Sequence, residues 1–274
     1  MSDEQRLRSA IDAWEEACSS MLALGHELGE DDWATQTDLP GWTVADVFGH
    51  TAHLEATLTG AAHDDVELPD SPHVKGPVNT WIEQGVHARR GRAALAVLEE
   101  IDGAVARRAA HLRENPPTDG SARADGGLGE WDWNTLLSNR VVDVWMHEQD
   151  VRRAVGRPGG FSGAAPAHVV RTFLGAMPFV LGKRAGLEAG RSVLLTLTDA
   201  DISLTYTAGA DGRVSLTEEP PADPTLGPTL GLAMDTETFI VLCGGRQAPR
   251  DQQVAVTGDH ALADRVLTSM AVTP

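Results

Sequence analysis

Two residues four positions apart, Asp143 and His147, are of types that bind metal ions. Four residues turn a helix by about 400°, so in a helix these two side chains lie one above the other on one face. Their stripe is bounded by the apolar Leu136 and Ala154, which indicates that part of it faces the interior of a helical bundle. A carboxylate and an imidazole buried without partners are each unfavourable, and a bound metal ion would satisfy both. A charged stripe that faces solvent is the alternative interpretation.

A third ligand is expected on an earlier helical segment, where His50 follows Val47 by three residues and precedes Leu54 by four. This spacing places His50 on the packed side of that helix, although a core histidine satisfied by other groups would show the same spacing. His53, one turn further on, could replace it. Two imidazoles and one carboxylate form the three-ligand set of catalytic zinc, with a fourth position open for water or substrate. The same set also suits non-haem Fe(II), so the ligand types alone do not select the metal.

Two further polar residues of the Asp143 stripe, Arg140 and Asp150, have candidate roles around such a site. Asp150 lies one turn after His147 and could orient its imidazole by a hydrogen bond, or it could be a plain surface aspartate. Arg140 could bind a substrate carboxylate through its guanidinium. The alternative for Arg140 is an ion pair with Asp143 within the helix.

The elements that must position these residues form a helical part followed by a part rich in strands. Apolar residues at helical spacing predict five helical segments, at about 5–30, 44–58, 78–113, 132–155 and 167–185. Period-two alternation then predicts strands at about 192–198, 202–207, 213–217 and 254–257, with short helices starting at Asp235 and Asp259. Helices first and strands afterwards predict an α+β protein with a helical bundle over residues 1–187 and a small α+β domain over residues 188–274.

The charge balance excludes some classes of function. The chain has 22 basic and 40 acidic residues, a net charge of −18, which disfavours binding to nucleic acid or to anionic membranes. We expect no membrane span, because no apolar run approaches the roughly 20 residues that a span needs, and we expect no signal peptide from the first residues. Cys18 and Cys243 lie far apart, which gives no disulfide framework. We therefore expect a cytoplasmic protein, a monomer or a homodimer.

Two sequence motifs resemble a known family. The run Leu39-Pro40-Gly41-Trp42-Thr43 leading to His50, and the run from Asp143 through His147 to Pro158, are similar to the actinobacterial branch of the DinB-like metal-binding four-helix bundles. That branch contains the mycothiol-dependent maleylpyruvate isomerases. Three later runs match the small domain of these proteins in kind and order: 235–239, 244–246 and 256–259. The resemblance therefore covers nearly the whole chain.

The resemblance implies a divalent metal, usually zinc, held by His50, Asp143 and His147. The isomerase has glutamate where this chain has Asp143. Because aspartate is one methylene shorter, this ligand must come from a closer backbone or bind through water. The negative charge is kept in either case.

The resemblance also implies mycothiol as a thiol cosubstrate and a small electrophile as its partner. In an isomerase of this kind the thiolate adds to the activated alkene of maleylpyruvate, the resulting single bond rotates, and elimination yields fumarylpyruvate. In an S-transferase the thiolate stays attached to the electrophile. Either reaction needs a cation for a substrate carboxylate, for which Arg246 is the first candidate by resemblance and Arg140 the second. A non-catalytic binding or regulatory protein is the alternative.

Overall fold

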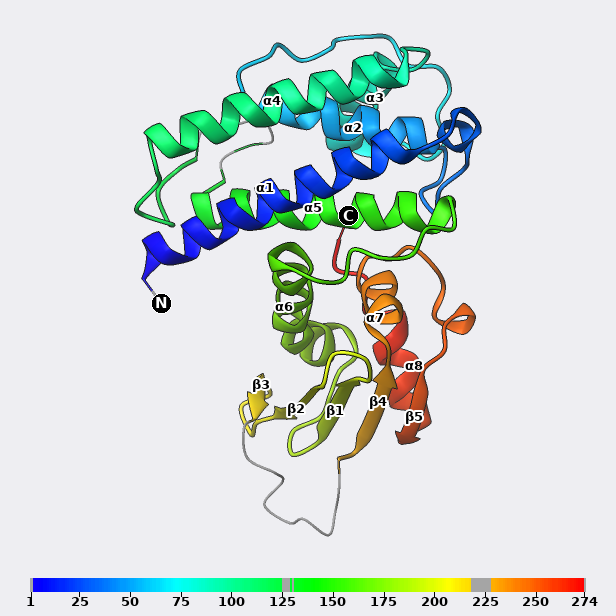
Figure 1. Cartoon of the computed structure of the whole chain (residues 1–274). Coiled ribbons are helices and arrows are strands. Elements are labelled where there is room, and N and C mark those ends of the chain that lie inside the picture. The colour runs from blue at the N-terminus through cyan, green and yellow to red at the C-terminus, as the bar shows by residue number, and fades with distance from the viewer. Residues whose placement is uncertain (1, 125–128, 130, 218–227, 274) are drawn as a thin grey trace. The chain divides into compact units, whose positions relative to one another are not determined.

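The computed structural model describes residues 2–124, 129, 131–217 and 228–273 (Figure 1). The chain divides into two compact units, Met1–Val169 and Val170–Pro274, which are described separately. The first unit is helical and the second holds a five-stranded sheet with helices, so the predicted α+β class is confirmed. The division falls inside helix α6. The boundary between the two predicted domains, at residue 187, lies after α6 and stays a prediction.

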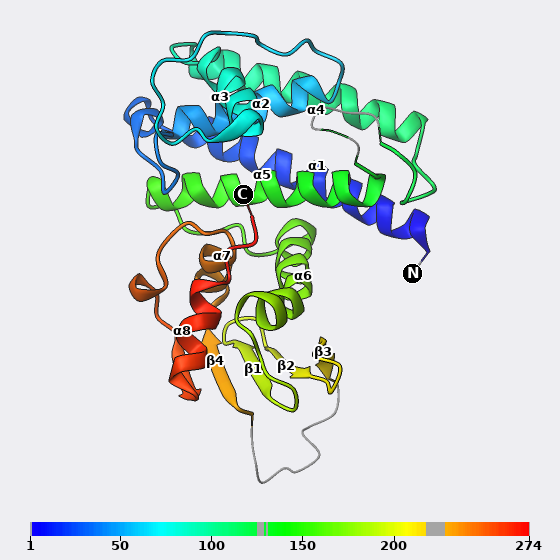
Figure 2. The same ribbon diagram turned by 180° about the vertical axis from the view of Figure 1, so that it is seen from behind.

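Four long helices form the bundle of the first unit (Figures 1 and 2). In it, α1 packs against α4 and α5, and α2 packs against α4 and α5 as well as against the shorter α3. The core between them is apolar and includes the fully buried Trp14, Phe48, Ile101 and Val144. The helices are α1 (Asp3–Glu27), α2 (Val44–Thr57), α3 (Gly76–His87), α4 (Ala94–Glu114) and α5 (Trp133–Ala154), with a 3-10 turn η1 (Glu30–Ala34) after α1.

The two helices that carry the candidate ligands begin at side-chain caps. Thr43 caps α2, as the sequence predicts: its hydroxyl accepts from the Asp46 amide, and the Asp46 carboxylate accepts from the Thr43 amide at 2.9 Å. Asp132 caps α5 by accepting from the Thr135 amide at 2.7 Å. These caps fix the residue at which each helix starts, and therefore the face on which each ligand lies.

One predicted helix is two helices in the structure. The pattern over 78–113 divides into α3 and α4, and between them Gly91 has a φ of +77°. That left-handed conformation is favourable for glycine and ends a helix. Both helices pack against α2, which accounts for apolar spacing on both sides of the break.

The expectation that no stretch is apolar enough to span a membrane is wrong. Helix α6 (Ala164–Phe179) continues past Pro178 into a π-helical turn η2 (Val180–Arg184), and the whole stretch Ala164–Arg184 has the length and composition of a span. A core helix of a soluble protein has the same properties, and α6 buries Val169, Phe173 and Met177 within the protein. The stretch is therefore weak evidence for a membrane span.

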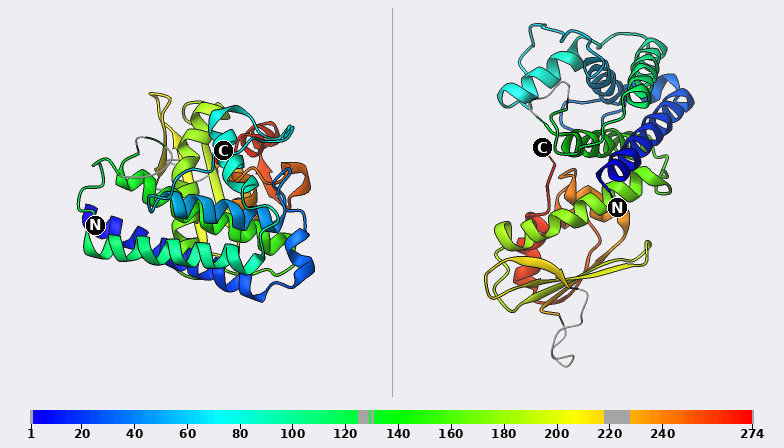
Figure 3. Two further views of the ribbon diagram at one scale, coloured as in Figure 1. Left: turned by 90° about the horizontal axis from the view of Figure 1, so that it is seen from above. Right: turned by 90° about the vertical axis from the view of Figure 1, so that its left-hand side faces the viewer.

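The second unit is built on a sheet with strand order β3-β2-β1-β4-β5. Strand β4 pairs in parallel with β1 and the other neighbours are antiparallel. Its helices lie on one face of the sheet (Figure 3). Strand β4 was not predicted from the sequence. The elements are β1 (Ser192–Leu197), β2 (Ile202–Ala208), β3 (Val214–Thr217), β4 (Leu230–Met234), α7 (Thr236–Cys243), the 3-10 turn η3 (Pro249–Asp251), β5 (Ala255–Gly258) and α8 (His260–Thr268).

Candidate metal centre

The structure brings His50, Asp143 and His147 together in the first unit. One ligand atom from each lies within 4.8 Å of the others. The His50 Nε2 atom is 3.3 Å from Asp143 Oδ2, and the His147 Nε2 atom is 3.8 Å from Asp143 Oδ1. Both histidines are buried, whereas the Asp143 side chain keeps 21% of its exposure. Two imidazole nitrogens and a carboxylate oxygen thus converge at a point that stays open on one side.

The contacts show that α2 and α5 are antiparallel. His50, early in α2, contacts Asp143 and His147, whereas Glu55, later in α2, contacts the earlier Arg140 of α5. Each helix supplies ligands from its buried face, where Val47 on α2 and Val144 on α5 are fully buried. The packing that forms the core therefore also aims the ligands at one point.

Asp150 lies behind the imidazole of His147, as the sequence suggested. Its Oδ2 atom is 3.1 Å from His147 Nδ1, which leaves Nε2 facing the other two ligands. Asp150 is fully buried and forms an ion pair with Arg153, which also binds Asp38 at 2.8 Å. A carboxylate that fixes the second nitrogen of a ligating histidine is a common feature of metal sites.

Arg140 is committed to two carboxylates of the protein. Its Nε and Nη2 atoms donate to Glu55 Oε1 at 3.0 and 2.9 Å, and its Nη1 atom donates to Asp143 Oδ2 at 3.0 Å. Glu55 is fully buried and also accepts from Trp14 at 3.2 Å and from Arg108 at 3.3 Å. The pairing of Arg140 with Asp143 is the alternative that the sequence left open. Glu55 was not anticipated, although it follows the apolar Phe48 by seven residues, a spacing that places both on one face of α2.

This network sets the charges at the centre. Burial would raise the pKa of Asp143, but Arg140 and the two histidines lower it well below the ordinary value. Burial lowers the pKa of His50, although Asp143 opposes the shift. The favoured state is therefore an ionised carboxylate beside a neutral imidazole, which is the state in which both bind metals.

Trp42 covers the two histidines from the loop before α2. Its ring centroid lies 5.0 Å from that of His50 and 5.9 Å from that of His147. Its indole N–H donates to Glu83 at 2.8 Å, and the buried Glu83 also pairs with Arg90 at 2.9 Å. This role of Trp42 was not predicted from the sequence, although Trp42 belongs to the motif that carried the family resemblance.

The second candidate histidine, His53, is not part of the ligand group. Its Nδ1 atom is 3.4 Å from Asp64 Oδ2, and its ring lies 4.6 Å from that of Trp81 and 5.3 Å from that of His63. Burial lowers the pKa of His53 to about 4, and the nearby Arg89 adds to this shift. His53 is therefore a neutral histidine packed among aromatic rings.

Arg246 lies in the second unit, just after α7. Its Nη1 atom donates to the carbonyl of Gly244 at 2.7 Å and to Thr273 Oγ1 at 3.3 Å. These bonds hold the guanidinium against the end of the chain. A role for Arg246 in binding a substrate carboxylate stays a prediction.

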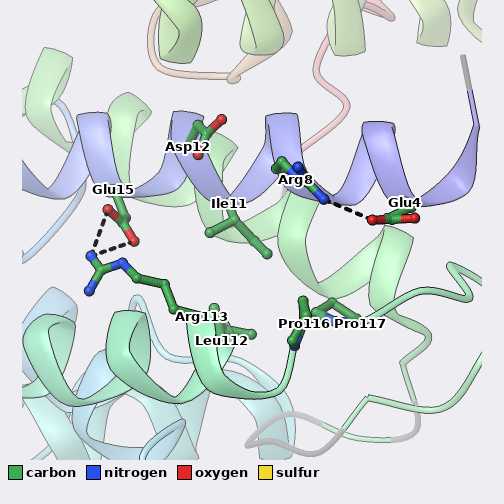
Figure 4. A pocket seen from close by; sticks show the side chains of 9 residues that line it. All are labelled: Glu4, Arg8, Ile11, Asp12, Glu15, Leu112, Arg113, Pro116 and Pro117. Atoms are coloured by element: carbon green, nitrogen blue, oxygen red, sulfur yellow. Dashed lines mark hydrogen bonds and ion pairs between the residues drawn. The ribbon is translucent and has the colours of Figure 1, made fainter.

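A hollow of about 390 Å³ lies between α1 and the end of α4 and contains none of the predicted site residues (Figure 4). Much of its lining is charged and paired: Arg8 binds Glu4 at 2.7 Å, and Arg113 binds Glu15 at 3.1 Å. Exposed pairs of this kind are typical of a solvated surface. We therefore interpret this hollow as part of the solvated surface and not as the candidate active site.

The first unit is thus a helical bundle in which two histidines and a carboxylate converge from α2 and α5. A family model described as the mycothiol maleylpyruvate isomerase N-terminal domain matches residues 14–152. The chain belongs to this family, and the resemblance drawn from the sequence is confirmed.

Two solved structures share the fold of the chain. They are a mycothiol-dependent maleylpyruvate isomerase, at 18% identity, and a histidine-to-alanine variant of such an isomerase, at 17%. Each has a TM-score of 0.56 and aligns over 94% of this chain and 96% of its own. No curated protein matches the chain.

Proposed function

We propose that the protein is a metal-dependent enzyme that activates mycothiol for addition to a small electrophile, as an isomerase or as an S-transferase. The observation that carries the proposal is the convergence of His50, Asp143 and His147 within 4.8 Å on a face that stays partly open. Membership of the mycothiol maleylpyruvate isomerase N-terminal domain family supports the choice of thiol. The expected location is the cytoplasm, and the expected state is a monomer or a homodimer.

The three residues fit a divalent metal by their chemistry. Zinc is our first choice because two imidazoles and one carboxylate, with a fourth position open, are the donor set of catalytic zinc. Such a metal, when bound, makes a coordinated thiol ionise at neutral pH.

The surrounding residues hold the ligands in place. Asp150 fixes the ring of His147 through Nδ1, so that Nε2 points at the centre. Arg140 holds Asp143 through Oδ2 at 3.0 Å and keeps its carboxylate ionised, leaving the other oxygen for a metal. Trp42 covers both imidazoles and shields that side from water. We assign the binding of a substrate carboxylate, where a substrate has one, to Arg246.

Elemental analysis of the purified protein tests the metal. We expect about one metal ion per chain in the wild type and none in Asp143→Ala. The matched control is Asp102→Ala, an exposed aspartate on α4, which should keep the metal. An Asp143→Ala protein with unchanged metal content would disprove the assignment.

A thiol screen tests the activity. With an electrophile and the metal-loaded protein, we expect consumption of mycothiol to exceed that of glutathione and that of a reaction without protein. The aspartate in place of the isomerase's glutamate favours a second candidate, a non-catalytic binding protein. Metal binding without turnover of any thiol would support that candidate instead.

A further inference from the structure

Arg153, in the last turn of α5, bridges two carboxylates beside the candidate centre. Its Nη2 atom donates to Asp150 Oδ1, and its Nε atom donates to Asp38 Oδ2 at 2.8 Å. The other oxygen of Asp150 lies 3.1 Å from His147 Nδ1. Polar contacts therefore run without a break from Asp38, through Arg153 and Asp150, to a candidate metal ligand.

The orientation of Asp150 depends on this arginine. Asp150 is fully buried. Removing one partner of a buried ion pair is strongly unfavourable, because the remaining charge is left in a medium that solvates it poorly. Without Arg153 this carboxylate loses the cation that holds it in place, and its hold on the ring of His147 weakens.

Asp38 lies in the loop that carries Trp42, and this Trp42 loop, residues 36–43, is closed by its own hydrogen bonds. The Gln36 side-chain amide donates to the carbonyls of Leu39 and Trp42 at 2.9 and 2.8 Å. Thr37 donates to the Trp42 carbonyl through its hydroxyl at 2.8 Å and through its amide at 3.1 Å. Because these bonds join both ends of the loop, a displacement of Asp38 would also displace Trp42.

The Trp42 ring leads back to the candidate ligands. Its centroid lies 5.0 Å from that of His50 and 5.9 Å from that of His147. Arg153 thus reaches the centre along two routes. One passes through Asp150 to the ring of His147, and the other passes through the Trp42 loop to the indole that covers both imidazoles.

We propose that Arg153 is a positioning residue that couples the Trp42 loop to the metal centre, so that the loop and a bound metal ion stabilise each other. By thermodynamic linkage, a loop conformation that raises metal affinity is itself stabilised by the metal to the same extent. The proposal rests on the proposed function, since it concerns how the same centre holds its metal.

Zinc binding to the full chain, measured by competition with a chelator, tests the first route. We expect Arg153→Met to weaken zinc binding about tenfold or more, because the acceptor behind His147 is no longer held. Arg152→Met is the matched control. Arg152 is exposed to a similar extent, 18% against 14%, and it also pairs with a fully buried carboxylate, that of Glu148 at 2.7 Å. Its removal should lower stability but leave the zinc affinity unchanged.

The second route is tested at the Trp42 loop. Asp38→Asn leaves Arg153 paired with Asp150, and we expect it to weaken zinc binding at least about twofold. Asp32→Asn is its control and should have no effect, since the Asp32 side chain is similarly exposed, 29% against 24%, and pairs with Arg157 instead. If Arg153→Met does not fold, Asp38→Asn and Asp32→Asn decide the test.

Hydrogen exchange measures the reciprocal effect of the metal on the loop. In the wild type, zinc should slow the exchange of the Thr37 and Trp42 amides, which are bonded inside the loop. The effect should be much smaller in Asp38→Asn and in Arg153→Met. An arginine with a merely structural role would lower stability without changing this response to zinc.

Equal zinc affinity in Arg153→Met and Arg152→Met would overturn the proposal, and so would an unchanged affinity in Asp38→Asn. With a wild type that binds zinc, either result leaves the proposed function intact. A wild type that binds no zinc would overturn the proposed function, and this proposal with it.

Discussion

Two histidines three residues apart on α2 have different surroundings although they are equally buried. His50 and His53 are 2% and 1% exposed. His50 faces Asp143 and a second imidazole, with ligand atoms within 4.8 Å. His53 faces Asp64, which is already paired with Arg89 at 2.7 Å, and the ring of Trp81. Burial therefore does not distinguish a ligand from a packing residue, whereas the groups that converge with it do.

The largest expected effect separates these two histidines directly. His50→Ala should reduce the metal content from about one ion per chain to near zero, because a site with two remaining ligands loses its affinity. His53→Ala should keep the metal and lower only the stability. Elemental analysis of the two variants, purified side by side, measures the difference. Equal metal loss in both variants would show that His53 is as important for metal binding as His50.

The second largest effect concerns stability: removing Arg140, which pairs with Glu55, should cost more free energy of unfolding than removing Arg89, which pairs with Asp64. Arg140→Met leaves Glu55 buried without its main partner and should lower the free energy of unfolding by about 3–5 kcal/mol. Arg89→Met should cost less, because Asp64 is 34% exposed and Glu100 keeps its pair with Arg92. Urea unfolding of both variants checks the order. A larger loss in Arg89→Met would show that the pair between Arg89 and Asp64, beside His53, stabilises the fold more than the pair between Arg140 and Glu55.

The stability of the protein should depend on pH through His53. Its pKa is about 4 in the folded chain against about 6.5 when unfolded. Between these values the unfolded state binds more protons, so stability falls as the pH falls from 6.5 to 4 and by no more below it. The loss is at most about 3 kcal/mol, at 1.36 kcal/mol per pKa unit.

In His53→Phe, the free energy of unfolding should depend less on pH between 4 and 6.5. Urea titrations at several pH values measure this dependence. A histidine NMR titration of the wild type measures the pKa itself. A measured value near 6.5 would contradict the description of His53 as a buried neutral ring.

Asp150→Asn should weaken metal binding by about 10–100-fold without abolishing it, because the imidazole of His147 loses an oriented charged acceptor. Competition with a chelator measures the affinity. Asp64→Asn is the matched control, since Asp64 contacts His53 in a similar way, and it should leave the affinity unchanged. A loss of equal size in Asp64→Asn would argue against a specific role for Asp150.

The sequence predicted what one helix determines by itself. Asp143 and His147 lie on a single helix, so their spacing alone places them on one face. The bond between Glu55 and Arg140 joins two helices, and spacing within either helix does not encode how they pack. Strand β4 was missed because its five residues, one of them Gly231, follow a proline-rich run and carry a weak strand pattern.

The smallest expected effect concerns the packing around His53. A Cβ atom at Gly85 in α3 would lie 2.1 Å from the ring of His53, so Gly85→Ala must move that ring. Overpacking costs about 1–3 kcal/mol. The gain in helix propensity returns about 1 kcal/mol, which leaves a net loss of up to about 2 kcal/mol.

Gly103→Ala in α4 is the matched control, because its new methyl group meets only the flexible end of Arg107 at 3.3 Å. It should be neutral or slightly stabilising. Urea unfolding measures both variants, and metal content should be unchanged in each, since His50 faces other residues. Loss of metal in Gly85→Ala would show that the surroundings of the two histidines are coupled, so that the packing of His53 helps to place His50.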